Sequence, residues 1–188
     1  MTRETLEPIP ADPSRAHRAL DWVEELLAAF VLVVALFTFL VRVVTVSGAS
    51  MSPTYDDGDR LVAVPWFTYQ AGDVIVSGDD PAMIKRVIAT EGQTVALDEI
   101  HGTVLIDGYP LDESVFGLEN GRTGLPYASL ERTRFPVTVP KGYVFVLGDN
   151  RPVSLDSRYA SVGLVDCRSI RGRVLFRLWA AGAPSPNQ

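Results

Sequence analysis

The pattern of apolar and polar positions divides the chain into two parts of different character. Residues 26–41 are apolar apart from one threonine, and extending the run to residue 46 adds only two polar side chains. About 20 apolar residues span the core of a bilayer, and an arginine near the end can reach the headgroups. The run also lacks the polar stripe of a helix that packs on a soluble core. It therefore predicts a transmembrane helix over residues 21–46.

A cleaved secretory signal peptide remains an alternative, because small residues follow the run at 47–49. The apolar region of such a peptide is shorter than this one, which favours a retained anchor. Basic residues precede the run at Arg3, Arg15 and Arg18 and follow it at Arg42 and Arg60. This weak positive-inside bias predicts a cytoplasmic tail over residues 1–20 and an extracytoplasmic domain over residues 47–179.

After residue 46 the apolar period changes from that of a helix to that of strands. Short runs rich in valine, isoleucine and aromatic residues alternate with Gly, Pro and Asp turns. The expected strands are Arg60–Val64, Asp73–Ser77, Met83–Thr90, Gln93–Leu97, Thr103–Ile106, Phe135–Val139, Tyr143–Leu147 and Arg171–Leu178. We expect a mainly β fold, an antiparallel barrel or sandwich behind a single transmembrane α-helix. Residues 110–134 predict a variable surface loop or insertion, and residues 180–188 a flexible tail.

Composition narrows the function classes. The formal charge is −6 and the 17 basic residues are scattered, which argues against nucleic-acid binding. Cys167 is the only cysteine, so no intrachain disulfide can form, and we expect a buried structural thiol. One cysteine and two histidines argue against a Cys/His metal site, and we expect no cofactor.

Two residues suggest nucleophilic chemistry only when they are considered together. Ser50 lies in SGASMSPT (residues 47–54), which alone resembles a linker, and Lys85 lies in the strand-like MIKRVI, where a lone lysine usually faces solvent. A serine needs a base, and His101 lies in a Gly-flanked turn typical of an exposed loop. Lys85 and Arg86 are consecutive and face opposite sides of a strand. If Lys85 faces the buried side, burial lowers its pKa and leaves an amine able to accept the serine proton.

A third segment, GDNRPVSLDSR at residues 148–158, concentrates Asp, Arg, Ser, Gly and Pro behind an apolar run. Such a segment can be a solvated loop or a salt-bridged scaffold beneath a site. The hydroxyl of Ser154 could accept a hydrogen bond from a neutral lysine and aim its lone pair.

These three segments, in this order and behind an apolar run, resemble the boxes of the bacterial type I signal peptidases, the leader peptidases of serine peptidase family S26. SGASMSPT resembles the nucleophile box, MIKRVIATEG the lysine box and GDNRPVSLDSR the final box. Asp59 and residues 71–76 fit a weaker intervening pattern. The resemblance reaches from residue 26 to residue 173 and omits the variable residues 98–140.

The resemblance implies a role for each matching residue. It makes Ser50 the nucleophile, Lys85 the general base, Ser154 the group that orients the lysine, and Arg86 with Asp149 and Asp156 with Arg158 the supporting ion pairs. The Ser50 N–H would be one oxyanion donor. The second would come from Gly48, where many relatives carry serine, through its backbone or a water, or from Ser47. Val46, Met51 and Ile84 would line shallow substrate pockets, unless they are plain core residues.

The implied reaction is removal of signal peptides from exported precursors after small residues of the Ala-x-Ala type, through an acyl-enzyme. The implied location is the bacterial cell membrane, with a cytoplasmic N-terminus, a lipid bilayer partner and the secretion translocon nearby. Ser50 follows the span by about four residues, or ~13 Å of extended chain, which suits this plane. Trp66, Phe67 and Tyr69 predict either membrane contact or core packing.

Three other functions stay open or are disfavoured. A dedicated processing peptidase, for example for a pilin, fits the same residues. A catalytically silent membrane-tethered binding domain would predict substitution of the serine or the lysine, and both are present. A self-cleaving Ser/Lys repressor is soluble and carries a DNA-binding domain, which this sequence does not suggest.

Overall fold

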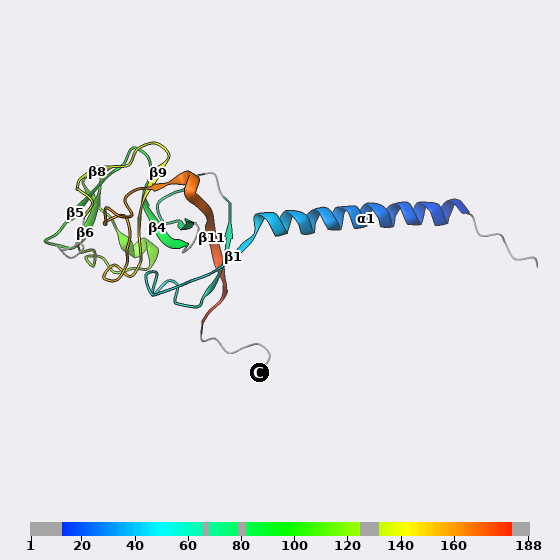
Figure 1. The fold of residues 1–188 in the computed structure, drawn as a ribbon, viewed down its shortest axis with the longest axis horizontal. Helices are drawn as coiled ribbons and strands as arrows, with labels where there is room; N and C mark the ends of the chain where they lie inside the picture. Colours follow the sequence, from blue (N-terminus) through cyan, green and yellow to red (C-terminus); the bar gives the residue numbers. More distant parts are fainter. Residues whose placement is uncertain (1–12, 66–67, 79–81, 125–131, 182–188) are drawn as a thin grey trace, which may run out of the picture. The chain divides into compact units, whose positions relative to one another are not determined.

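The computed structural model describes residues 13–65, 68–78, 82–124 and 132–181. The chain divides into two units, residues 1–40 and 41–188. The first unit contains the helix α1, Pro13–Leu40 (Figure 1). Side chains of this helix such as Trp22, Phe30 and Phe37 are largely exposed. Of the helices in the described part of the chain, none is both long and apolar enough to cross a membrane.

The predicted helical segment 21–46 requires a correction at its C-terminal end. The helix ends at Leu40, and Arg42–Thr45 form strand β1, which pairs antiparallel with β2, Arg60–Val64. Three of the four β1 residues are β-branched and favour a strand, and β2 offers them an open edge. Residues 42–45 therefore belong to the sheet of the second unit.

The second unit is mainly antiparallel β, as the sequence predicts. Its seven-stranded sheet has the order β1-β2-β11-β3-β4-β9-β10. The strands not yet bounded are β3 (Val74–Ser77), β4 (Met83–Ala89), β9 (Tyr143–Leu147), β10 (Val165–Asp166) and β11 (Ile170–Trp179). A second sheet, β7-β6-β5-β8, comprises β5 (Thr94–Asp98), β6 (Thr103–Ile106), β7 (Tyr109–Pro110) and β8 (Val137–Thr138). Two 3₁₀ helices, η1 (Glu113–Phe116) and η2 (Cys167–Ser169), complete the described elements.

The core has three apolar clusters that fix the sheets relative to the loops between them. One cluster joins the two sheets, with Ile88 and Phe145 of the larger sheet against Val95 and Val104 of the smaller one. Another contains Val46, Met51, Leu61 and Ile84 and so packs the chain around Ser50 onto β2 and β4. The segment around Ser50, residues 47–54, therefore packs on the sheet and is not a free linker.

Several expectations about loops and single residues have structural outcomes. Of the predicted loop or insertion, residues 125–131 lie outside the described residues. The described part is not simply surface, because Glu113 and Thr123 are buried where they meet Arg151. Cys167 is half-buried rather than fully buried, since the short helix η2 lies at the margin of its cluster. Trp66, Phe67 and residues 182–188 of the predicted tail lie outside the described residues, whereas Tyr69 is half-buried.

Candidate active site

The structure brings Ser50 and Lys85 together, although they are 35 residues apart in the chain. Lys85 lies in β4, held between β3 and β9, and only 5% of the residue is exposed. Its Nζ is 2.8 Å from Ser50 Oγ and donates to the Ile84 carbonyl at 2.9 Å. A hydroxyl and an amine at this distance can exchange a proton directly.

Burial lowers the pKa of the Lys85 amine, and the carboxylates of Asp156 and Asp149 oppose that shift. The burial effect is the larger one, because the pKa remains below its ordinary value of 10.5. The neutral amine can accept the Ser50 proton while one of its N–H groups keeps the Ile84 carbonyl. Lys85 is therefore the candidate base at this site, whereas His101 is exposed and pairs with Asp98 at 2.6 Å.

Both faces of β4 are covered at this point, so Lys85 and its neighbour Arg86 are both buried, on opposite sides of the strand. Arg86 forms a bidentate pair with Asp149, with Nε 2.8 Å from Oδ1 and Nη2 2.6 Å from Oδ2. This pair ties the lysine strand to the loop of residues 148–158. Planar pairs of this kind fix geometry as well as charge.

The second predicted ion pair lies within that loop. Arg158 Nε is 2.8 Å from Asp156 Oδ1, and Arg158 Nη2 is 2.9 Å from Asp156 Oδ2. Asp156 also accepts the Gly148 N–H at 3.1 Å, and Arg158 donates to the carbonyls of Arg151 and Ser154. All of these carboxylate and guanidinium groups are buried. The pair therefore closes the loop on itself.

Ser154 is buried, and among the described residues its hydroxyl has no hydrogen-bond partner. The predicted contact with Lys85 is accordingly not formed. The hydroxyl does lie close to the segment around Ser50. A Cβ added at Gly148 would clash with Ser154 and would also lie 2.5 Å from Ser50 O. Gly148 is the residue that lets these two segments approach so closely.

The residues expected to stabilise an oxyanion differ in what they offer. Gly48 has a φ of 83°, and its N–H donates to Asp57 Oδ1 at 2.7 Å. That bond occupies the Gly48 N–H, so this backbone group is not the second donor in this arrangement. A water at Gly48 and Ser47, the other two expected sources, stay predictions. Among the described residues, the Ser50 N–H has no acceptor. The Ser50 amide is therefore the available donor beside the hydroxyl.

A cavity of about 650 Å³ opens beside Ser50 and Lys85. Val46, Met51 and Ile84, the predicted pocket residues, line it but are almost fully buried in the core as well. Val153 and Leu155 line it too and are 62% and 54% exposed. Sequence reasoning missed these two, although they are the apolar residues on either side of Ser154. The cavity thus presents apolar walls next to Ser50 and Lys85.

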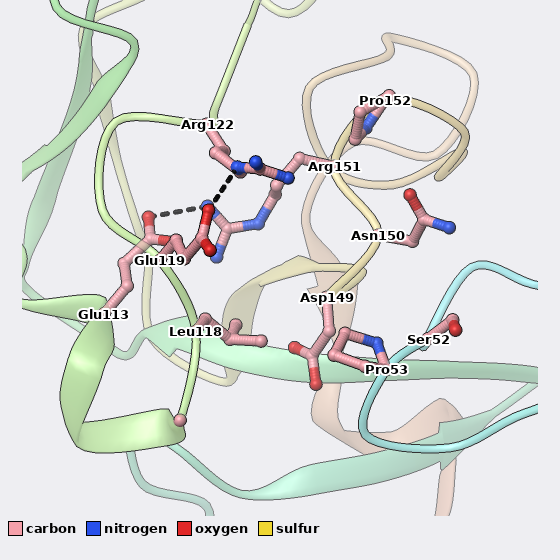
Figure 2. A pocket seen from close by; sticks show the side chains of 11 residues that line it. Ser52, Pro53, Glu113, Leu118, Glu119, Arg122, Asp149, Asn150, Arg151 and Pro152 are labelled. Atoms are coloured by element: carbon pink, nitrogen blue, oxygen red, sulfur yellow. Dashed lines mark hydrogen bonds and ion pairs between the residues drawn. The ribbon is translucent and has the colours of Figure 1, made fainter.

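A second cavity, of about 360 Å³, lies between residues 52 and 53, the η1 region and the loop of residues 148–158. Figure 2 shows Arg151 extending from that loop toward Glu113 and Glu119. Arg151 Nη1 is 2.6 Å from Glu113 Oε1 and also contacts Thr123 Oγ1, and its Nε donates to Gly148 O at 3.0 Å. The sequence motifs assigned no role to Arg151, because its side-chain partners Glu113 and Thr123 lie in a region that carries no motif.

Comparison with known proteins adds to this geometry. Residues 19–179 match the family described as signal peptidase, peptidase S26. The chain is similar to signal peptidase I of Bacillus licheniformis, with 32% identity over 170 residues that cover 87% of this chain and 90% of that protein. It is also similar to signal peptidase IB of Staphylococcus aureus, with 33% identity over 175 residues, 85% of this chain and 89% of that one.

One solved structure is also similar in sequence, a signal peptidase I from Enterococcus faecalis. It is 33% identical, with a TM-score of 0.44, and the alignment covers 60% of this chain and all of that chain.

Proposed function

Because the chain belongs to the signal peptidase family, peptidase S26, and is a peptide-bond hydrolase of that family, we propose that it removes signal peptides from exported precursors with Ser50 as nucleophile and Lys85 as general base. The observation that carries the proposal is the 2.8 Å contact between Lys85 Nζ and Ser50 Oγ. It involves a buried lysine whose pKa is lowered, the form of lysine that can act as a base.

Acylation follows from this geometry. Neutral Lys85 takes the Ser50 proton as Oγ attacks the carbonyl carbon of the scissile peptide. The Ser50 N–H donates to the oxyanion that forms, and the Lys85 ammonium then protonates the departing amine of the mature chain. In deacylation a water attacks the ester, Lys85 takes a proton from that water, and Ser50 recovers its hydroxyl as the ester breaks.

The loop of residues 148–158 supports the base in this proposal. The pairs Arg86–Asp149 and Asp156–Arg158 hold the loop against the lysine strand. Ser154 orients Lys85 at the stage when the amine becomes an ammonium, since its buried hydroxyl otherwise has no partner in the described part of the chain. A buried hydroxyl left unpaired costs about 1–3 kcal/mol, so a partner acquired during the reaction is favourable.

Substrate selection belongs to the cavity of about 650 Å³ beside Ser50. Its apolar walls at Val46, Met51 and Ile84 accept small side chains on the signal-peptide side of the scissile bond. Val153 and Leu155 supply the accessible side of the same cavity. We assign to this site a preference for small residues of the Ala-x-Ala type.

We further propose that the chain is membrane-bound through the apolar run of residues 26–41, with the second unit on the extracytoplasmic side near the secretion translocon. Residues 26–40 of the run lie within α1, and apolar side chains there such as Leu26, Phe30 and Val31 are exposed. Within the second unit, exposed Val43, Phe176 and Leu178 provide further apolar surface on β1 and β11. Both features suit a lipid bilayer partner.

The test is cleavage of a purified precursor bearing an Ala-x-Ala site, followed by mass spectrometry of the products. Wild-type protein should cut after the second alanine, and Ser50→Ala and Lys85→Ala should each lose at least ~10³-fold in kcat/KM, as expected for loss of a nucleophile or its base. Full activity in either variant would show that the dyad is wrongly assigned.

A further inference from the structure

Asn150 contacts the chain on both sides of Ser50. Its backbone N–H donates to Ser50 O at 3.0 Å, and its side-chain Nδ2 donates to Ala49 O at 3.0 Å. These two carbonyls belong to the two peptide groups that flank Ser50. Ala49 O also accepts the Ser52 N–H at 3.3 Å, within the same turn. Asn150 is thus the residue of the 148–158 loop that holds both peptide groups of the nucleophile.

The contact with Ala49 determines where the Ser50 N–H points. A trans peptide group is planar, so its N–H is directed opposite to its carbonyl. When Asn150 Nδ2 holds Ala49 O, the Ser50 N–H of the same peptide group is directed away from Asn150. That N–H has no acceptor among the described residues. It is therefore held in one direction and left free to donate.

Asn150 is itself fixed by its two neighbours in the chain. Asp149 forms the bidentate pair with Arg86, which follows Lys85 in β4. On the other side, Arg151 is anchored to Glu113 and to Gly148 O. The lysine that contacts Ser50 Oγ and the asparagine that holds the Ser50 backbone are therefore linked through one adjacent ion pair. These contacts fix the Ser50 hydroxyl, the Lys85 amine and the Ser50 N–H relative to one another.

We propose that Asn150 is a positioning residue that orients the Ala49–Ser50 peptide group so that the Ser50 N–H faces the developing oxyanion. The proposal rests on the proposed Ser50 and Lys85 mechanism and adds to it the group that aims its amide donor. Loss of an oxyanion donor costs about 10²–10³ in rate. Asn150→Ala misdirects the donor without removing it, so a decrease of about 10-fold in kcat is expected, with KM within about twofold.

The experiment uses the full chain and compares Asn150→Ala, Asn150→Asp and Asn150→Gln with wild type. The aspartate should lose more than the alanine, because its carboxylate oxygen replaces the amide donor beside Ala49 O. The glutamine should recover part of the activity, since it keeps an amide donor. Ser52→Ala is the matched control: it removes the 2.6 Å bond to Asp56 from the same turn and leaves both carbonyl contacts of Asn150. It should keep kcat within about twofold.

Two inhibitors give a readout that a purely structural role would not move. A peptide aldehyde with a small-x-small sequence adds to Ser50 Oγ, the hydroxyl proton passes to Lys85, and the aldehyde oxygen becomes the oxyanion. The corresponding peptide alcohol binds without this step. Asn150→Ala should weaken the aldehyde by about the same factor as kcat and leave the alcohol unchanged.

Each result decides a separate question. If wild type cleaves the precursor with dependence on Ser50, but Asn150→Ala retains full kcat and aldehyde affinity, the positioning role is overturned and the dyad stands. Equal losses of aldehyde and alcohol affinity, with a lowered Tm, would also overturn it and show a structural role only. Failure of wild type to cleave any small-x-small precursor would instead contradict the proposed function.

Discussion

At Lys85, burial and two carboxylates act on the pKa in opposite directions, and burial is the stronger. This balance has consequences for both rate and stability. Compared with the unfolded chain, in which the pKa of Lys85 is near 10.5, the folded state favours the neutral amine. The Ser50 hydroxyl needs a base to become a nucleophile. The reactivity of Ser50 therefore depends on the pKa of Lys85.

We expect kcat/KM to fall as the pH decreases through the lowered pKa of Lys85, because the ammonium cannot accept the Ser50 proton. A pH–rate profile with a peptide substrate measures this acidic limb. Its midpoint should lie below 10.5. A rate independent of pH across the acidic and neutral range would exclude Lys85 as the base.

The same pKa can be checked from stability. Between the folded pKa and about 10.5, the unfolded chain binds more protons at Lys85 than the folded one, so stability rises with pH in this window. Below the folded pKa the destabilisation is complete. Lys85→Met should therefore raise the urea midpoint most at low pH and progressively less as the pH approaches 10.5.

Gly148 supplies a second test at the residue scale. A Cβ at this position would lie 2.5 Å from Ser50 O and would clash with Ser154. We expect Gly148→Ala to cost about 1–3 kcal/mol in urea unfolding, as overpacking does, and to lower kcat by displacing Ser50. Gly124→Ala is the control, because a Cβ there meets no atom of the described residues within 4 Å and Gly124 is not among the glycines with positive φ. Equal effects of the two substitutions would contradict the close approach.

At the scale of elements, the loop of residues 148–158 connects the lysine strand to the η1 region. Arg86–Asp149 makes the first connection and Arg151–Glu113 the second, and both pairs are buried. Removing one partner of a buried pair leaves an uncompensated charge, which is far more costly than losing an exposed pair. The η1 region, which carries no recognisable motif, thus stabilises the loop of residues 148–158, which carries one.

We expect Arg151→Met to destabilise the protein by about 3–5 kcal/mol, because Glu113 then remains buried without a cation. Pairing it with Glu113→Gln should recover part of the loss. Arg122→Met is the matched control, since Arg122 pairs with Glu119 beside the cavity of about 360 Å³ that Arg151 also lines. The Arg122 and Glu119 side chains are 69% and 74% exposed. That change should cost no more than about 1 kcal/mol. Urea unfolding of the four proteins measures the difference.

At the scale of the whole molecule, the division at residues 40 and 41 separates the apolar helix from the sheets. In the described part of the chain, the members of the three apolar clusters of the core belong to the second unit. The proposed membrane attachment and the proposed chemistry therefore depend on different parts of the chain. The two can be separated by truncation.

A fragment of residues 41–188 should fold with a Tm close to that of the full chain and hydrolyse a short peptide with kcat/KM within about twofold. It should cut a vesicle-embedded precursor much more slowly, because it is no longer held at the same surface. The full chain should resist carbonate extraction from membranes and the fragment should not. Extraction of the full chain by carbonate would contradict the anchor.

The helices and strands differ in how well the sequence alone predicted their positions. Strands such as β2 and β9 could be placed from short β-branched and aromatic runs between turns. The short strands β7 and β10 could not, because two residues carry no period. The C-terminal end of the helix was predicted too late, at residue 46 and not at Leu40. Apolar β-branched residues suit a membrane helix and an edge strand alike, and here residues 42–45 pair with β2.

By itself, the sequence determined the apolar run, the β character of the rest and the three segments that carry Ser50, Lys85 and Ser154, because these depend on local composition and spacing. Only the tertiary structure decided that both faces of β4 are buried, that the Gly48 N–H is occupied by Asp57 and that Asn150 holds the backbone at Ser50. Those are contacts between segments distant in the chain or between neighbouring turns. They exist only once packing has brought donors and acceptors within hydrogen-bonding distance.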